Sequence, residues 1–224
     1  MQKRKALPFG SRFSTLYDTL HRIYFPFMKL FTRRFIIDLF LIVVIGISLY
    51  ALTHNSLVRP TPVTKKGFWS IQLIQYPLVF GMAGHNYLVL KDGKDRTIRE
   101  LHGFPTETKN GKEMWKYIGT NTADKLKVWE FDSPHFYIAN KNFPGILLYE
   151  GSEADAWHIW KKSAPCKGEI NKENIPYPPY GVNVRGDTEN SNSVAYTLSL
   201  CMNLTTKHLG LITPGWGKNL LGAR

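Results

Sequence analysis

The sequence has 224 residues, of which 43% are apolar and 13% aromatic, and this suits one domain with a packed core plus additional segments. The formal net charge is +12, but residues 1–34 hold eight basic side chains and one acidic one, so the rest of the chain is only mildly basic. This distribution does not favour a nucleic-acid-binding domain, so no nucleic-acid partner is expected, and it indicates a basic N-terminal arm. The chain has no glycine-rich phosphate loop and no paired Cys/His spacing, so we expect no cofactor and no metal.

An apolar segment, FIIDLFLIVVIGISLYAL, follows the arm at residues 35–52 and contains one charged residue, Asp38. A transmembrane helix needs about 20 mostly apolar residues, so the segment predicts a single membrane-spanning helix with the lipid bilayer as its partner. The basic residues before it place the arm, residues 1–34, in the cytoplasm. This predicts a single-pass protein of the cell (inner) membrane whose C-terminal domain is periplasmic or extracellular. A cleaved signal peptide and a buried core helix are the alternatives.

The polar, proline-containing residues 53–67 are typical of a linker, and residues 68–224 are then expected to form one extracytoplasmic α+β domain. Hydrophobic periodicity and turn residues predict an antiparallel sheet with packed helices. The strands are expected at 68–80, 85–91, 96–102, 125–132, 135–140 and 145–150, and the helices at 152–162 and 191–203.

Three further features complete this outline. A loop rich in proline and glycine is expected at 175–190, and an apolar segment at 211–221 closes the chain. The chain has two cysteines, Cys166 and Cys201, which could pair in an oxidising compartment. Spacing alone leaves their pairing open.

The stretch GHNYLVLKDGKDRTIRELHG, residues 84–103, has a histidine near each end and reads as a β-hairpin. With Gly93 and Lys94 as a two-residue type II′ loop, His85 lies directly opposite His102. Opposed residues share one face of a sheet with Cβ atoms about 4.5–5.5 Å apart, so this register brings the two imidazoles together. A register slip of one residue would separate them.

A candidate nucleophile, Ser191, lies at the start of the predicted helix 191–203. A helix N-terminus offers backbone N–H groups that can hold an oxyanion, and a serine needs a histidine base oriented by a third polar group. His85 is the available base and His102 the available orienting partner. The alternatives are that Ser191 only caps the helix, as Asn190 or Ser193 could also do, and that the histidines are structural.

The same residues resemble the circularly permuted papain-like superfamily, which includes lecithin–retinol acyltransferase-like proteins, PPPDE peptidases and relatives of NlpC-type cell-wall peptidases. The hairpin resembles the H-x-x-[IL]-x-x-[GD]-x-G … H pattern, and NSNSV, residues 190–194, resembles N-C-[NE]-x-[FV]. The resemblance covers about a quarter of the chain, residues 80–103 and 188–221. It implies a papain-like antiparallel β-sheet with packed helices.

By position, the resemblance makes His85 the base, His102 the orienting residue and Ser191 the nucleophile, with Asn190 and Asn192 as flanking oxyanion or orienting residues. The departure is that serine stands where the family has cysteine, which is far more nucleophilic.

Two main functions stay open on this basis. One is an amide or ester hydrolase or acyltransferase, and the other is a catalytically inactive binding or scaffolding module. A cell-wall, lipid or peptide ligand would suit either, and a purely assembly-related exterior domain is a third reading.

Overall fold

The computed structural model describes residues 35–47, 62–78, 83–132, 143–183 and 187–222. The chain divides into two compact units, Met1–Tyr50 and Ala51–Arg224, which are described separately. Residues 35–47 form a helix in the first unit. No helix among the described residues is both long and apolar enough to cross a bilayer, which contradicts the predictions of a transmembrane helix at 35–52 and of a single-pass membrane protein. The predicted arm, residues 1–34, lies outside the described residues.

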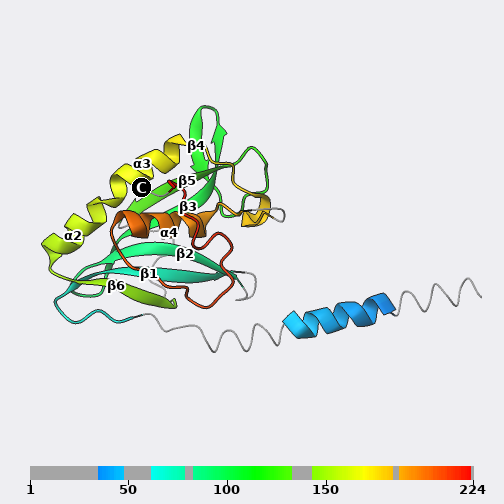
Figure 1. The fold of residues 1–224 in the computed structure, drawn as a ribbon, viewed down its shortest axis with the longest axis horizontal. Coiled ribbons are helices and arrows are strands. Elements are labelled where there is room, and N and C mark those ends of the chain that lie inside the picture. Colours follow the sequence, from blue (N-terminus) through cyan, green and yellow to red (C-terminus); the bar gives the residue numbers. More distant parts are fainter. Residues whose placement is uncertain (1–34, 48–61, 79–82, 133–142, 184–186, 223–224) are drawn as a thin grey trace, which may run out of the picture. The chain divides into compact units, whose positions relative to one another are not determined.

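The second unit is built on a six-stranded antiparallel sheet, in agreement with the predicted α+β class (Figure 1). The strand order is β4-β3-β2-β1-β6, and β5 pairs with residues 99–106 of β3, of which residues 99–101 also pair with β2. The strands are β1 (Trp69–Leu78), β2 (Ala83–Lys91), β3 (Thr97–Lys109), β4 (Lys112–Trp115), β5 (Lys125–Asp132) and β6 (Gly145–Gly151). The sequence did not predict β4, and the strand predicted at 135–140 lies outside the described residues.

The described residues of this unit also form three α-helices and a 3₁₀ turn. They are α2 (Glu153–Lys161), α3 (Ser163–Lys172), η2 (Pro179–Gly181) and α4 (Ser191–Cys201). Helix α2 begins where its capping signal predicted, because the Ser152 side chain accepts a hydrogen bond from the N–H of Asp155. Helix α3 was not predicted. In Figure 1, α4 (orange) runs across β2 and β3 (green).

The sheet has two distinct faces because side chains alternate along each strand. On the face packed by the helices, called the helix face, Leu88 and Leu101 join Val194 and Leu198 of α4 in the main core. On the opposite face, called the aromatic face, Tyr87 belongs to a separate buried cluster. Residues one apart on a strand therefore lie on different sides of the sheet.

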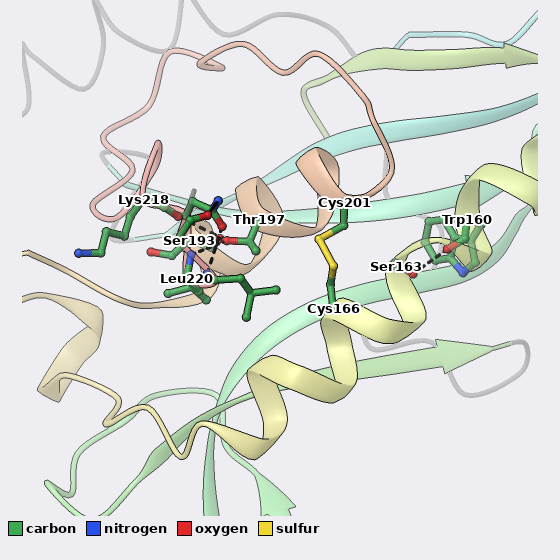
Figure 2. The surroundings of a disulfide bond; sticks show 11 residues. Trp160, Ser163, Cys166, Ser193, Thr197, Cys201, Lys218 and Leu220 are labelled. Carbon is green, nitrogen blue, oxygen red and sulfur yellow. Dashed lines mark hydrogen bonds between the residues drawn. A yellow bond between two sulfur atoms is a disulfide. The ribbon is translucent and has the colours of Figure 1, made fainter. Parts of the chain in front are cut away.

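A disulfide between Cys166 and Cys201 joins α3 to the end of α4 (Figure 2). The Cα atoms are 6.6 Å apart, which is within the range that a disulfide spans. The bond closes a loop over a sequence separation of 35 residues, and that loop contains η2 and all of α4 up to its last residue. The pairing that the sequence left open is thus formed.

The C-terminal segment packs against α4, as the apolar pattern at 211–221 predicted. Leu220 donates its N–H to the hydroxyl of Thr197 over 2.9 Å, and the Ser193 hydroxyl donates to the Gly215 carbonyl over 2.9 Å (Figure 2). Gly215 has φ +80, and a Cβ there would lie 2.6 Å from the Ser193 hydroxyl. The start of α4 is therefore held by the end of the chain.

Candidate functional site

The hairpin between β2 and β3 closes differently from the prediction of a Gly93-Lys94 loop. The backbone N–H of Asp95 donates to the Asp92 carbonyl, and Asp95 has φ 61, so the chain turns over more residues than two. The Asp92 carboxylate holds this turn by accepting hydrogen bonds from the N–H groups of Lys94 and Arg96, both at 2.9 Å. Together with a bulge at the start of β3, the longer loop shifts the pairing of β2 with β3 away from the predicted register.

The observed register differs from the predicted one by two residues. Val89 faces Glu100, whereas the prediction paired Val89 with Ile98. Because side chains alternate with a period of two, a shift of two residues leaves every side chain on its predicted face. His85 and His102 therefore still lie together on the aromatic face, but diagonally rather than directly opposite. The Nε2 atom of His85 is 3.0 Å from Nδ1 of His102.

A third side chain, Glu100, extends this pair. Its Oε2 atom lies 3.0 Å from Nε2 of His102, so the three groups form a continuous hydrogen-bonded chain from Glu100 through His102 to His85. Glu100 is 1% exposed and His102 is fully buried, while His85 is 6% exposed. Sequence reasoning missed Glu100 although a signal was present. Glu100 precedes His102 by two residues on the same strand, so strand alternation places both on one face.

Aromatic rings surround the chain of three. The Tyr87 ring stacks on His102 with centroids 4.4 Å apart, and Phe104 stacks on it at 5.2 Å. Phe131 of β5 meets the His102 ring edge-on at 5.7 Å. The His102 imidazole is therefore held among aromatic rings, where electrostatic interactions are stronger than in water.

Burial determines the protonation of the two imidazoles. It lowers the pKa of His102 well below 6.5, and it lowers the pKa of His85 in the same way, with a further contribution from a charge on His102. Both rings are therefore neutral at pH 7. With His102 donating a hydrogen bond from Nε2 to the Glu100 carboxylate, the neutral His102 presents the lone pair of Nδ1 to an N–H at His85 Nε2. In this arrangement the His85 lone pair lies on Nδ1.

Ser191 lies on the other side of the sheet from His85. A Cβ on Gly103 of β3 would approach the Ser191 Cα atom to 2.8 Å and a Val194 methyl group to 2.7 Å, so the start of α4 packs on the helix face at Gly103. His102 precedes Gly103 directly and points to the aromatic face. The structure thus brings His85 and His102 together but does not bring Ser191 to them.

The backbone donors at the start of α4 are engaged by the helix cap. The Asn190 side chain accepts hydrogen bonds from the N–H groups of Asn192 at 2.8 Å and Ser193 at 3.4 Å. The Asn192 amide accepts from the N–H of Asn86 at 2.8 Å and donates to the carbonyl of Pro214 at 3.0 Å. Asn190 and Asn192, which the resemblance offered as oxyanion or orienting residues, are therefore occupied by contacts that join α4 to β2 and the C-terminal segment.

The Ser191 side chain has Tyr177 as a neighbour. Burial raises the pKa of Tyr177 to about 12, and a hydrogen bond with Ser191 acts in the opposite direction. At pH 7 the Tyr177 phenol is therefore protonated and cannot serve Ser191 as a base. Within the part of the chain that the structure describes, no group of three His, Cys, Asp or Glu side chains is placed to hold a metal ion.

Comparisons with protein-family models, with curated proteins and with solved structures found no match to this chain. The resemblance to permuted papain-like proteins therefore has no support from a known relative, and neither does the assignment as a hydrolase.

Proposed function

We propose that this domain is an acid–base enzyme whose general base is His85, supported by His102 and Glu100, and that Ser191 has no part in the chemistry. The observation that carries this proposal is the buried chain of three ionisable groups joined at 3.0 Å and 3.0 Å. Buried titratable side chains with perturbed pKa values and specific charged partners are concentrated at functional sites.

In the proposed reaction, His85 takes a proton at Nδ1 from a hydroxyl group of the substrate or from a water molecule. Its Nε2–H then donates to His102 Nδ1, and the Nε2–H of His102 donates to Glu100. The positive charge that develops on His85 is stabilised through this chain by the Glu100 carboxylate. In the second half of the reaction the proton returns from His85 to the leaving group or to solvent.

A merely structural role explains the three residues less well. Replacing a buried ionic cluster by apolar side chains of similar volume is often neutral or even stabilising. Tyr87, Phe104 and Phe131 pack around the His102 ring, an environment that would suit an apolar side chain equally well. Of the three linked groups, His85 is the most exposed, at 6%, and we therefore assign the base to it.

The test compares the full-length protein with His85→Ala. Each is incubated with a small-molecule extract of cells that express it, and masses consumed and produced are followed by mass spectrometry. His158→Ala, which removes an exposed histidine on α2, is the matched control. We expect mass changes with the wild type and the control that fall at least about 100-fold in rate with His85→Ala. The proposal fails if no mass changes with the wild type, or if His85→Ala produces the same changes.

A further inference from the structure

The two sulfur atoms of the disulfide lie in different surroundings. Cys166 is buried, at 6% exposed, whereas Cys201 is half-buried beside the main core. The two residues also lie at opposite ends of their helices, because Cys166 belongs to the first turn of α3 and Cys201 is the last residue of α4 (Figure 2). The sulfur atoms therefore differ in access and in electrostatics, and the inference drawn from this difference is independent of the enzyme proposed above.

Helix α3 favours a negative charge on the Cys166 sulfur. The first turn of a helix presents unbonded N–H groups and the positive end of the helix dipole, which stabilise a thiolate. Helix α3 has 10 residues and no acidic residue in its first turn, and among the described residues no side chain caps its N-terminus. Lys162, directly before the helix, adds a positive charge. This end of α3 therefore keeps its positive character.

Helix α4 has the opposite effect on the Cys201 sulfur. The last turn of a helix carries the negative end of the dipole, which disfavours a thiolate. The last turn of α4 contains no basic residue that would offset it, and residues 191–206 hold no charged side chain of either sign. When the S–S bond breaks, the negative charge is therefore held better by Cys166 than by Cys201.

These differences give thiol–disulfide exchange a direction. An attacking thiolate reaches the more accessible sulfur, and the sulfur that carries a negative charge better leaves faster. Both criteria select the same course, in which the incoming sulfur bonds to Cys201 and the electron pair of the S–S bond goes to Cys166. The sequence contains no third cysteine, so the attacking thiol must come from another molecule.

Both helices keep other anchors when the bond opens. The Asn171 side chain of α3 donates to the Val128 carbonyl over 3.1 Å and accepts from the Val128 N–H over 2.6 Å, which attaches α3 to β5. At the start of α4, the Asn192 amide joins the helix to β2 and to the C-terminal segment. We therefore expect exchange to take place on the folded protein.

We propose that the Cys166–Cys201 bond is a thiol-exchange site, at which Cys201 accepts an external thiol as a mixed disulfide and Cys166 is released as a thiolate. A second external thiolate then attacks the external sulfur of the mixed disulfide, and Cys201 leaves and takes a proton from solvent. The chain gains two electrons, which the two external thiols supply as they become a disulfide. In the reverse direction, the Cys166 thiolate attacks the mixed disulfide at Cys201 and restores the bond.

Incubation of the full chain with glutathione at about 5 mM, followed by acid quenching, blocking of free thiols and peptide mass spectrometry, tests the proposal. We expect glutathione on Cys201 at least about tenfold more often than on Cys166. A parallel incubation uses a thioredoxin that keeps only its attacking cysteine. A mixed disulfide at Cys201 with either reagent supports the proposal and identifies whether the site takes small thiols or protein thiols. Equal labelling of the two cysteines, a preference for Cys166, or a bond that stays intact with both reagents would overturn it.

A pair of variants tests the role of the helix end. Ala164→Glu places a carboxylate at an exposed position in the first turn of α3 and should slow reduction by glutathione about two- to fivefold at low salt. Ala154→Glu makes the same change at an exposed position in the first turn of α2 and should react as the wild type does. The difference should fade at about 1 M salt, where exposed charges are screened. Equal rates for the two variants at low salt would refute the assignment of Cys166 as the leaving sulfur.

Discussion

Acidification should destabilise this domain through its two buried histidines. Burial lowers the pKa of His85 and of His102 well below 6.5, with His102 contributing to the shift at His85, whereas both titrate near 6.5 in the unfolded chain. Below that pH the unfolded state binds protons that the folded state does not. The free energy of unfolding therefore rises with pH across this window, and it is lost as the pH falls through 6.5 towards the lower pKa values of the folded state.

The magnitude follows from the unfolded-state pKa. At pH 5.5, one unit below that value, each imidazole that stays neutral in the folded protein lowers the free energy of unfolding by on the order of 1 kcal/mol. The two together give about 2–3 kcal/mol relative to pH 7.5, a large part of the roughly 5–15 kcal/mol that holds a typical domain folded. Carboxylates titrate near pH 4 in unfolded chains and contribute little above pH 5.5.

Urea unfolding of the full chain at pH 7.5, 6.5 and 5.5 measures this loss. His102→Asn should show about half the pH dependence of the wild type, and His158→Ala, at an exposed site, should show all of it. If His102→Asn does not fold, NMR titration of the wild-type imidazoles decides, since neither ring should gain a proton near pH 6.5. A wild-type stability that stays constant between pH 7.5 and 5.5, or imidazoles that titrate normally, would refute the reasoning.

Three further predictions concern stability. Replacing Cys166 and Cys201 together by alanine should lower the free energy of unfolding by about 3–4 kcal/mol, as expected for the loop that their bond closes, and reduction of the wild type should match it in urea unfolding. Gly103→Ala should lower the free energy of unfolding by about 1–3 kcal/mol because its Cβ would overlap α4. Gly168→Ala, in a helix with open space around the position, should raise it by about 0.5–1 kcal/mol. Equal melting temperatures for these two variants would contradict this prediction. Asn190→Ala should cost about 0.5–2 kcal/mol as a lost cap, and a melting temperature equal to that of the wild type would show that the cap is dispensable.

The register of the central hairpin shows where sequence reasoning reached its limit. The loop was predicted as Gly93-Lys94, but the Asp92 side chain holds a longer turn and shifts the pairing by two residues. Alternation of side chains is a local property of every strand, so the placement of His85 with His102 survived this error. The presence of Glu100 in the same chain of hydrogen bonds followed from the same alternation and could have been predicted.

The sequence by itself determined features that depend on near neighbours along the chain. These are the strands with period-two patterns, the cap of α2 at Ser152, the start of α4 near Asn190 and the shared face of the two histidines. Each depends on backbone geometry over a few residues, which local composition specifies. The apolar pattern of residues 35–52 was the exception, because no helix among the described residues is long and apolar enough to cross a membrane.

Only the tertiary structure decided which side of the sheet α4 covers, and therefore that Ser191 lies on the opposite side from His85. The helix packs on the face that carries Leu101 and Gly103, so the imidazoles of His85 and His102 lie on the other face. That choice depends on contacts between residues about 90 apart in sequence, Gly103 with Ser191 and Val194, which no local pattern encodes. In this packing Asn190 caps α4 and Asn192 joins the helix to β2 and to the C-terminal segment, where the sequence had predicted a catalytic site.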